Sequence, residues 1–137
     1  MKKHLYHGSI TPGIKELQPR KRFTPSALGK NISPAIYATD DPCYAVAHGF
    51  PWNTKEGFDT YYRKNKLILN VPKKFRKRLK QKIYIYKLPR KNFKLLKNVK
   101  PIGRNYRSHI KIKPTSVKYF KDIIAAFKYY KRKIRFI

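Results

Sequence analysis

Acidic residues are scarce in this sequence: six Asp and Glu stand against 35 Lys and Arg, giving a formal net charge of +29 at pH 7. A folded domain with this imbalance repels itself unless something anionic neutralises it. Nucleic acid is the most common partner of this kind, and an anionic membrane surface is the second. An AT-rich genome would explain the preference for Lys over Arg, but it does not explain the shortage of acids. The charge therefore points to contact with a polyanion.

Cysteine and long apolar runs are nearly absent as well. Cys43 is the only cysteine, which excludes an internal disulfide and favours an intracellular compartment. No run approaches the roughly 18 apolar residues of a membrane-spanning helix, so no transmembrane segment is expected. The first residues, MKKHLYHG, hold no apolar stretch of signal-peptide length. We expect a protein that is not secreted by a signal peptide, and that lies in the host cytoplasm or a virion if its origin is viral.

Metal ligands and catalytic cysteines are not indicated either. Cys43 and the four scattered histidines show no ligand spacing, so no metal is expected. Cys43 lies among small residues at the start of an expected helix, with no histidine paired to it in sequence. A nucleophilic role for it is therefore not favoured.

The length and the 41% hydrophobic content suit one domain with one core, residues 1–137. Apolar and alternating stretches predict strands at 4–9, 34–39, 66–72, 83–89 and 108–114. A helix is expected after Asp41 as N-cap, with Pro42 in its first position and Gly49 as its stop, and a short helix is expected through 120–127. The segment 20–34 is expected to be a basic loop and 51–66 to be irregular. The fold class is α+β.

Three short motifs occur in a recognisable order: "LYHGS" (5–9), "GIKELQP" (13–19) and "IYATDDP" (36–42). With them, the sequence resembles the ADP-ribosyltransferase family, which includes the poly-ADP-ribose polymerases, the diphtheria-type toxins and small phage and bacterial proteins. The resemblance covers nearly the whole chain. It implies a split antiparallel sheet with few short helices in a single domain.

The resemblance also implies an NAD site. His7 would donate to a ribose hydroxyl, the backbone of Gly8 would reach the nicotinamide carboxamide, and Tyr37 would offer a flat face to the ring. In relatives a second aromatic completes the sandwich, and here the smaller His48 stands near that position. The candidate NAD-binding residues are His7, Gly8, Ser9, Tyr37, Tyr44 and His48. For His7, the adjacent Gly8 and Ser9 favour a pocket over a satisfied histidine at a strand end. Tyr37 is equally compatible with an ordinary core tyrosine on a strand.

The third signature of the family, an acid on a late strand, is missing. Matching "SHIKIKP" by its closing Lys-Pro places Ser108 where the acid belongs, and residues 73–121 contain no Asp or Glu. The acid would stabilise the positive charge that develops on the ribose, so its loss is severe for catalysis. Some relatives, the tRNA 2′-phosphotransferases, use Arg and His against a phosphate instead, and Arg104, Arg107 and His109 are candidates for that role.

Three basic runs, 20–22, 73–82 and 128–135, are candidate contacts for nucleic acid. Aromatic residues interrupt two of them: Phe75 in the second, Tyr129 and Tyr130 in the third. Cations that track phosphates beside rings that stack on bases are what single-strand binding needs, although the runs could also be solvated faces with core aromatics. The candidate residues are Lys73, Lys74, Arg76, Lys77, Arg78, Lys80, Lys131 and Arg132.

Two functions follow from the sequence. The first is an ADP-ribosyltransferase-like fold that is degenerate in catalysis and binds nucleic acid or another polyanion through its basic surface, including as a structural component of a virus particle. The alternative is an active NAD-dependent mono-ADP-ribosyltransferase that uses His7 and Tyr37, with Ser108 at the position of the acid. The missing acid favours the first function, and the intact first motif favours the second.

Overall fold

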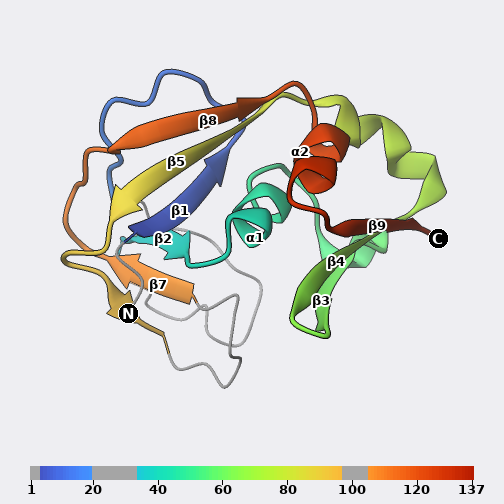
Figure 1. Ribbon diagram of the computed structural model, residues 1–137, viewed down its shortest axis with the longest axis horizontal. Helices are drawn as coiled ribbons and strands as arrows, with labels where there is room; N and C mark the ends of the chain where they lie inside the picture. The colour runs from blue at the N-terminus through green and yellow to red at the C-terminus, as the bar shows by residue number, and fades with distance from the viewer. Residues whose placement is uncertain (1–3, 20–33, 97–104) are drawn as a thin grey trace.

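Two β-sheets and a few short helices make up residues 4–19, 34–96 and 105–137, the part of the chain that this computed structural model describes (Figure 1). The larger sheet has the strand order β6-β7-β2-β1-β5-β8, with each neighbouring pair antiparallel. Its strands are β1 (His4–Ser9), β2 (Ile36–Thr39), β5 (Ile83–Pro89), β6 (Lys94–Leu95), β7 (Asn105–Ser108) and β8 (Ser116–Phe120). The domain is α+β with mostly antiparallel sheets.

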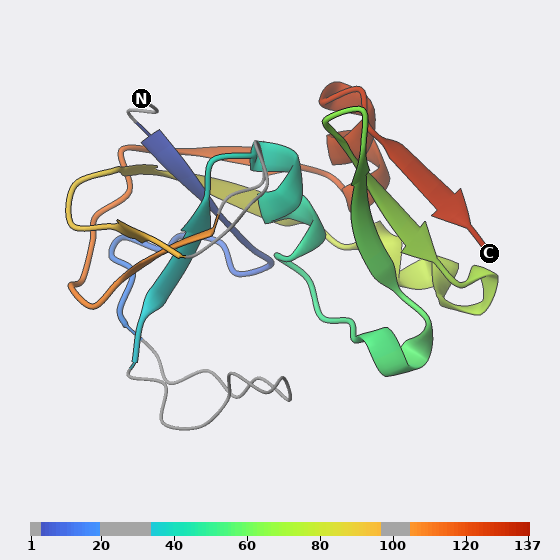
Figure 2. The same cartoon turned by 90° about the horizontal axis from the view of Figure 1, so that it is seen from below.

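The smaller sheet has the order β3-β4-β9 and includes a parallel pair. Its strands are β3 (Asp59–Arg63), β4 (Lys66–Val71) and β9 (Lys133–Phe136), and β9 runs parallel to β4. The helices are α1 (Pro42–Ala47), α2 (Ile123–Tyr129) and the 3-10 helices η1 (Thr54–Glu56) and η2 (Lys73–Lys80). Helix α1 packs on β1 and also contacts α2 and β4, so it lies between the two sheets (Figure 2).

Apolar side chains form a core on each face of the larger sheet. The main core lies on the side of α1 and α2 and includes Val46, Leu69, Ile85 and Phe127. The second core, on the opposite face, is built on these fully or almost fully buried residues: Leu5, Ile36, Ala38, Tyr86, Leu88 and Tyr106, with Leu17, Phe93 and Ile112 packed against them. Alternate residues of β5 enter different cores, which explains why its sequence is apolar almost throughout.

The contact between α1 and β1 requires glycine on both sides. A Cβ on Gly8 would overlap the carbonyl oxygen of Ala45, and a Cβ on Gly49 would lie 2.8 Å from the carbonyl carbon of Gly8. Backbone atoms cannot yield as a flexible side chain would, so the close approach of helix and strand depends on these two glycines. The face of Gly8 toward α1 is therefore filled by the helix.

The local features of the sequence predicted several elements correctly. Strands at 4–9, 34–39, 66–72 and 83–89 are confirmed as β1, β2, β4 and β5. The first helix is confirmed with its cap: the backbone N–H of Cys43 donates to Oδ1 of Asp41 at 2.9 Å, and Pro42 stands in the first turn. The second helix is confirmed as α2, with Asp122 as its N-cap.

Other expectations were wrong because pairing with other strands, near or distant in sequence, decides them. The segment 51–66 is not irregular: it holds η1 and β3, and β3 turns into β4 through Lys64 and Asn65, both at positive φ (50° and 62°). No strand spans 108–114, because β7 ends at Ser108 and Ile112 forms only a bridge with Leu17. The expected helix near the C-terminus is flanked by two strands, β8 and β9, that were not expected. The basic loop 20–34 lies, apart from residue 34, outside the described residues.

Replacing Gly8 by Ala is expected to lower the free energy of unfolding by about 2–3 kcal/mol, because the new methyl group forces α1 away from β1. Urea unfolding followed by circular dichroism measures it. Gly13→Ala is the control: Gly13 has open space around its Cβ position and φ +67°, so it should lose only about 1 kcal/mol of conformational energy. Equal losses in the two variants would contradict the role of the close contact.

Candidate functional site

The first two signature residues of the sequence meet where β1 and β2 separate. These strands pair at one position, Tyr6 opposite Thr39, whereas β1 pairs with β5 along its whole length. Beyond that position Nδ1 of His7 lies 2.7 Å from the carbonyl oxygen of Tyr37. A carbonyl can only accept, so Nδ1 carries the proton and donates it. The half-buried His7 side chain thus spans the point at which the two strands part.

Ser108 lies level with the end of β2 that diverges from β1, but it is buried. Ser108 is 1% exposed. Its hydroxyl donates to the carbonyl oxygen of Ile110 and accepts from the N–H of Ile110, both at 3.2 Å. It pairs with Ile36, on the face of the sheet where Tyr106 enters the second core. The structure therefore places Ser108 in a packing role, because the strand that carries it starts three residues earlier than the sequence suggested.

Asn105 is the β7 residue that faces α1. It pairs with Thr39, at the end of β2 that leads into the helix, and its amide nitrogen lies 3.5 Å from the hydroxyl of Tyr44. An amide is neutral, so Asn105 offers dipoles but no negative charge to a cationic ribose. Sequence reasoning missed Asn105. The signal available was the alternation in "NYRS", in which Tyr106 and Ser108 are buried whereas Asn105 and Arg107 are half-buried.

Tyr44 and His48 are stacked on each other rather than open to a ligand. Their ring centroids are 4.1 Å apart at 29°, and the other neighbour of His48 is Trp52 at 5.2 Å. The stack continues through Trp52–Phe58 at 5.7 Å and Phe58–Phe75 at 5.6 Å. Nε2 of His48 also lies 3.3 Å from the hydroxyl of Thr60. A nicotinamide could stack on the face of His48 that Tyr44 covers only by displacing Tyr44.

The residues considered for phosphate chemistry do not form a described cluster. Arg104 lies outside the described residues. Arg107 pairs with Tyr37 across β2 and β7. His109 is exposed beyond the end of β7, with Nδ1 2.9 Å from the carbonyl oxygen of Pro34. Ser9, at the end of β1, accepts a hydrogen bond from the backbone of Thr11, which closes the turn that follows.

Asp41 connects the helix start to the smaller sheet. Besides capping α1 through Oδ1, it accepts at Oδ2 a hydrogen bond of 2.9 Å from the hydroxyl of Tyr62. Burial, and after it the charge of Asp41, raises the pKa of Tyr62 above its usual value. The same two causes raise the pKa of the buried Cys43 thiol. Both groups stay protonated at neutral pH, so neither provides an anionic nucleophile.

Two basic runs that are distant in sequence converge at one edge of the molecule. The N–H of Lys73, at the start of η2, donates to the carbonyl of Ile137 at 2.9 Å, and the guanidinium of Arg76 lies 4.8 Å from the ring centroid of Phe136. Figure 1 shows η2 and β9 side by side near the C-terminus. We call the exposed cations of these two elements the basic edge: Lys73, Lys74, Arg76, Lys77, Lys80, Lys133 and Arg135.

The side chains of η2 point either to solvent or into the domain. A 3-10 helix has three residues per turn, so Lys74, Lys77 and Lys80 lie in one row, about 6 Å apart along the axis. Leu79 is fully buried, and Phe75 stacks on Phe58. The row of lysines therefore faces solvent while the other faces hold the helix to the domain.

Two arginines proposed for nucleic acid have partners within the fold. Arg78 makes an ion pair with Glu56 and lies with its guanidinium 4.3 Å from the ring centroid of Phe75, and its hydrogen bond lowers the pKa of the Glu56 carboxyl. Arg132 donates from Nη1 to the carbonyl of Tyr130 at 2.7 Å, at the end of α2, and its Nε is buried without a partner among the described residues. Lys131 remains exposed beside it.

No group of three His, Cys, Asp or Glu side chains in the described residues is arranged to hold a metal ion. Over the same residues, no helix has the length and apolar character needed to cross a membrane. No protein-family model matches the sequence, and neither a curated protein nor a solved structure matches the chain. The functional interpretation therefore depends on the geometry of the site.

Cys43 is expected to resist a disulfide thiol reagent at pH 8 in the folded protein, because it is 1% exposed and its thiol pKa is raised. Absorbance of the released thiolate measures the rate. The same protein unfolded in urea is the control, and it should react faster by orders of magnitude. Rapid reaction of the folded protein would contradict the buried, protonated state.

Proposed function

We propose that this protein binds single-stranded nucleic acid without sequence preference, through the basic edge, and that its ADP-ribosyltransferase-like fold is not used for catalysis. The observation that carries the proposal is the convergence of η2 and β9. Hydrogen bonding of Lys73 to Ile137 and packing of Arg76 on Phe136 bring the cations of two distant basic runs onto one continuous edge. A line of cations of this kind is what a phosphate backbone follows.

Five acids of the described residues are used mainly within the fold. Asp41 caps α1, Asp122 caps α2, and Glu56 is paired with Arg78. Asp59 accepts from the N–H of Thr60, and Glu16 accepts from the side chain of Gln18. Of these five, Glu56 has the pKa of its carboxyl lowered by Arg78 and, in addition, by the charge of Lys74. One carboxylate shared between Arg78 and Lys74 leaves most of the positive charge of the basic edge for an external anion to relieve.

Exposed tyrosines beside lysines favour nucleic acid over a membrane surface. Tyr119 is 50% exposed with Nζ of Lys82 at 5.8 Å from its ring centroid, and Tyr129 is 56% exposed with Nζ of Lys118 at 4.0 Å. Such rings stack on bases, and the adjacent cations contact the phosphates. A helix that lies in a membrane interface needs an apolar outer face, whereas the Phe75 and Leu79 side chains of η2 pack toward the protein.

Replacing Lys74, Lys77 and Lys80 together by Gln should weaken binding of a short oligothymidylate and reduce its salt dependence. Each phosphate contact contributes about 0.7 to the slope of log K against log salt for a single strand, so three lost contacts should lower the slope by about 2. Fluorescence anisotropy over a salt series measures both quantities.

A matched variant separates the site from total charge. Replacing Lys91, Lys94 and Lys111 by Gln removes the same charge from exposed positions outside the basic edge. It should leave the slope nearly unchanged. Equal losses of affinity and slope in the two triple variants would reject the basic edge as the binding site.

A second candidate function, NAD-dependent ADP-ribosyl transfer, is favoured by one arrangement. The half-buried His7 and Tyr37 lie on adjacent strands where β1 and β2 separate, and Asn105 follows on the next strand. This arrangement supports the order of signature strands that the family resemblance implies. The self-stacked Tyr44 and His48, and an amide where a carboxylate is needed, oppose turnover.

If the second candidate is right, NAD binds with an affinity that resists moderately high salt, and His7→Ala abolishes it, because His7 holds the cofactor by a specific hydrogen bond. Calorimetry measures the binding; the salt removes non-specific attraction of an anion to a protein of net charge +29. His109→Ala is the control, since His109 is exposed and bonded to Pro34. Binding that vanishes with salt in all three proteins would leave the fold without its NAD site.

A further inference from the structure

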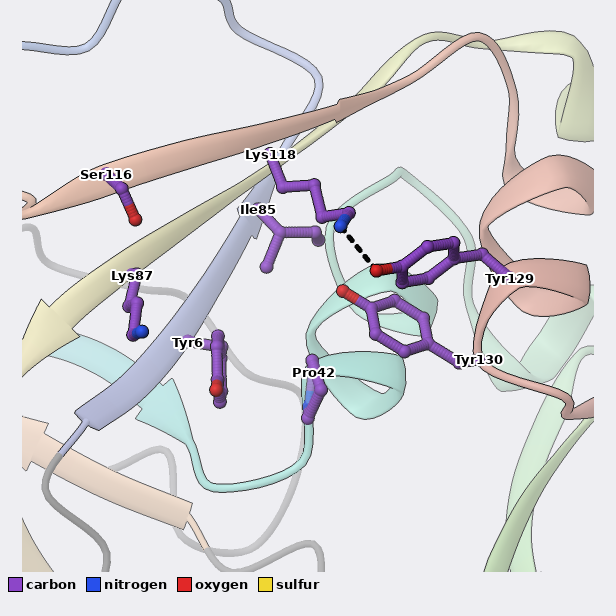
Figure 3. Close-up of a pocket in the computed structure, with 8 residues that line it drawn as sticks. All are labelled: Tyr6, Pro42, Ile85, Lys87, Ser116, Lys118, Tyr129 and Tyr130. Carbon is purple, nitrogen blue, oxygen red and sulfur yellow. Dashed lines mark hydrogen bonds between the residues drawn. The ribbon is translucent and has the colours of Figure 1, made fainter.

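A hollow of about 290 Å³ lies on the α1 side of the larger sheet (Figure 3), and neither His7 nor Tyr37 is among its lining residues. Strands β1, β5 and β8 contribute its floor and one wall, and the end of α2 and the start of α1 contribute the others. The lining residues are Tyr6, Pro42, Ile85, Lys87, Ser116, Lys118, Tyr129 and Tyr130. None of them belongs to the basic edge.

Polar donors converge on this hollow from several elements. In Figure 3 the hydroxyl groups of Tyr129 and Tyr130 both point from α2 toward its centre, and Lys118 reaches across from β8. Nζ of Lys118 donates to the hydroxyl of Tyr129 at 2.6 Å. Lys87 approaches from β5 and Ser116 from β8. No carboxylate is among the lining residues, which include two lysines, although the charge of Asp41, the residue before Pro42, also acts on Tyr130.

The hydroxyl of Tyr130 is held in its donor form. Burial raises the pKa of Tyr130 first, and the nearby Tyr129 and Tyr6 raise it further. A phenol that stays protonated can donate to an anion without becoming a competing negative charge. The ammonium groups of Lys87 and Lys118, the phenol of Tyr130 and the hydroxyl of Ser116 are thus available to the anionic end of a ligand.

Apolar and aromatic side chains line the rest of the hollow. Ile85 lies beside Lys118, with which it pairs across β5 and β8, and the ring of Tyr6 stands between Lys87 and Pro42 (Figure 3). An aromatic base can pack on such a ring while its phosphate lies among the donors. The volume is at the lower end of small-molecule sites, which suits one nucleotide unit rather than a dinucleotide.

We infer that this hollow binds a nucleotide monophosphate unit, with its phosphate between Lys87, Lys118 and Tyr130 and its base against Tyr6. The site does not depend on the basic edge, because the two share no residue. The unit has two possible sources: a free mononucleotide, or the 5′-phosphorylated end of a strand. The chemistry of recognition is the same for both.

The test titrates AMP, adenosine and inorganic phosphate into the protein by calorimetry in moderately high salt. The same proteins are mixed with an oligothymidylate with and without a 5′-phosphate. Lys87→Met and Tyr130→Phe alter the hollow, and Tyr130→Phe keeps the ring and its packing. Lys111→Met is the control, since Lys111 is exposed and does not line the hollow.

If the ligand is a free nucleotide, AMP binds more strongly than adenosine or phosphate does. Its affinity then falls about tenfold or more in both hollow variants but not in Lys111→Met. A preference for the 5′-phosphorylated strand that both hollow variants remove supports a strand end. Absence of both effects, or an equal loss in Lys111→Met, overturns the proposal. The variant with Lys74, Lys77 and Lys80 replaced by Gln is expected to lose oligonucleotide binding but to keep AMP binding. The two measurements therefore distinguish failure of the hollow from failure of the basic edge.

Discussion

The seating of α1 on β1 is the constraint on which the rest of the structure depends. Because Gly8 and Gly49 carry no side chain, the helix backbone lies directly on the strand. From that position α1 contacts β4 and α2, and so joins the two sheets around the main core. The same seat gives a structural reason for the glycine of the "HGS" motif, which can be required by packing as well as by a ligand.

The scarcity of acids shapes the surface through where the acids are used. Asp41 and Asp122 satisfy the N-termini of the two α-helices, and Asp40 and Asp41 are each 8% exposed. Capping is worth about 1 kcal/mol at each helix start, so the fold retains these carboxylates even in a chain with few of them. The consequence is an outer surface with few acids to pair with its lysines, on which two of the lysines, Lys82 and Lys118, lie over tyrosine rings instead.

Elements with local causes were predictable from the sequence. The start of α1 at Asp41-Pro42 and strand β5, which is buried on both faces, are each determined by neighbouring residues in the sequence. Both elements were predicted. β3 was missed because its half-exposed Tyr61 and Tyr62 give no clear alternation, and its partner β4 defines it. Local patterns could not give the contact of the His7 ring with the backbone carbonyl of Tyr37, or the places of Ser108 and Asn105 along β2, because both depend on the pairing of distant strands. The meeting of η2 with β9 needed a parallel pairing that no local pattern contains.

That parallel pairing also has a consequence for how the chain folds. Lys133 pairs beside Ile68, so the smaller sheet closes only when segments far apart in sequence come together. Contacts of this kind cost loop entropy before they return any packing energy, and they slow folding. Here closure also brings the run 128–135 against 73–82, two strongly basic segments, so Coulomb repulsion opposes it. Counter-ions screen that repulsion and lower the barrier to closure. Higher ionic strength, or a bound polyanion, is therefore expected to speed the last step of folding.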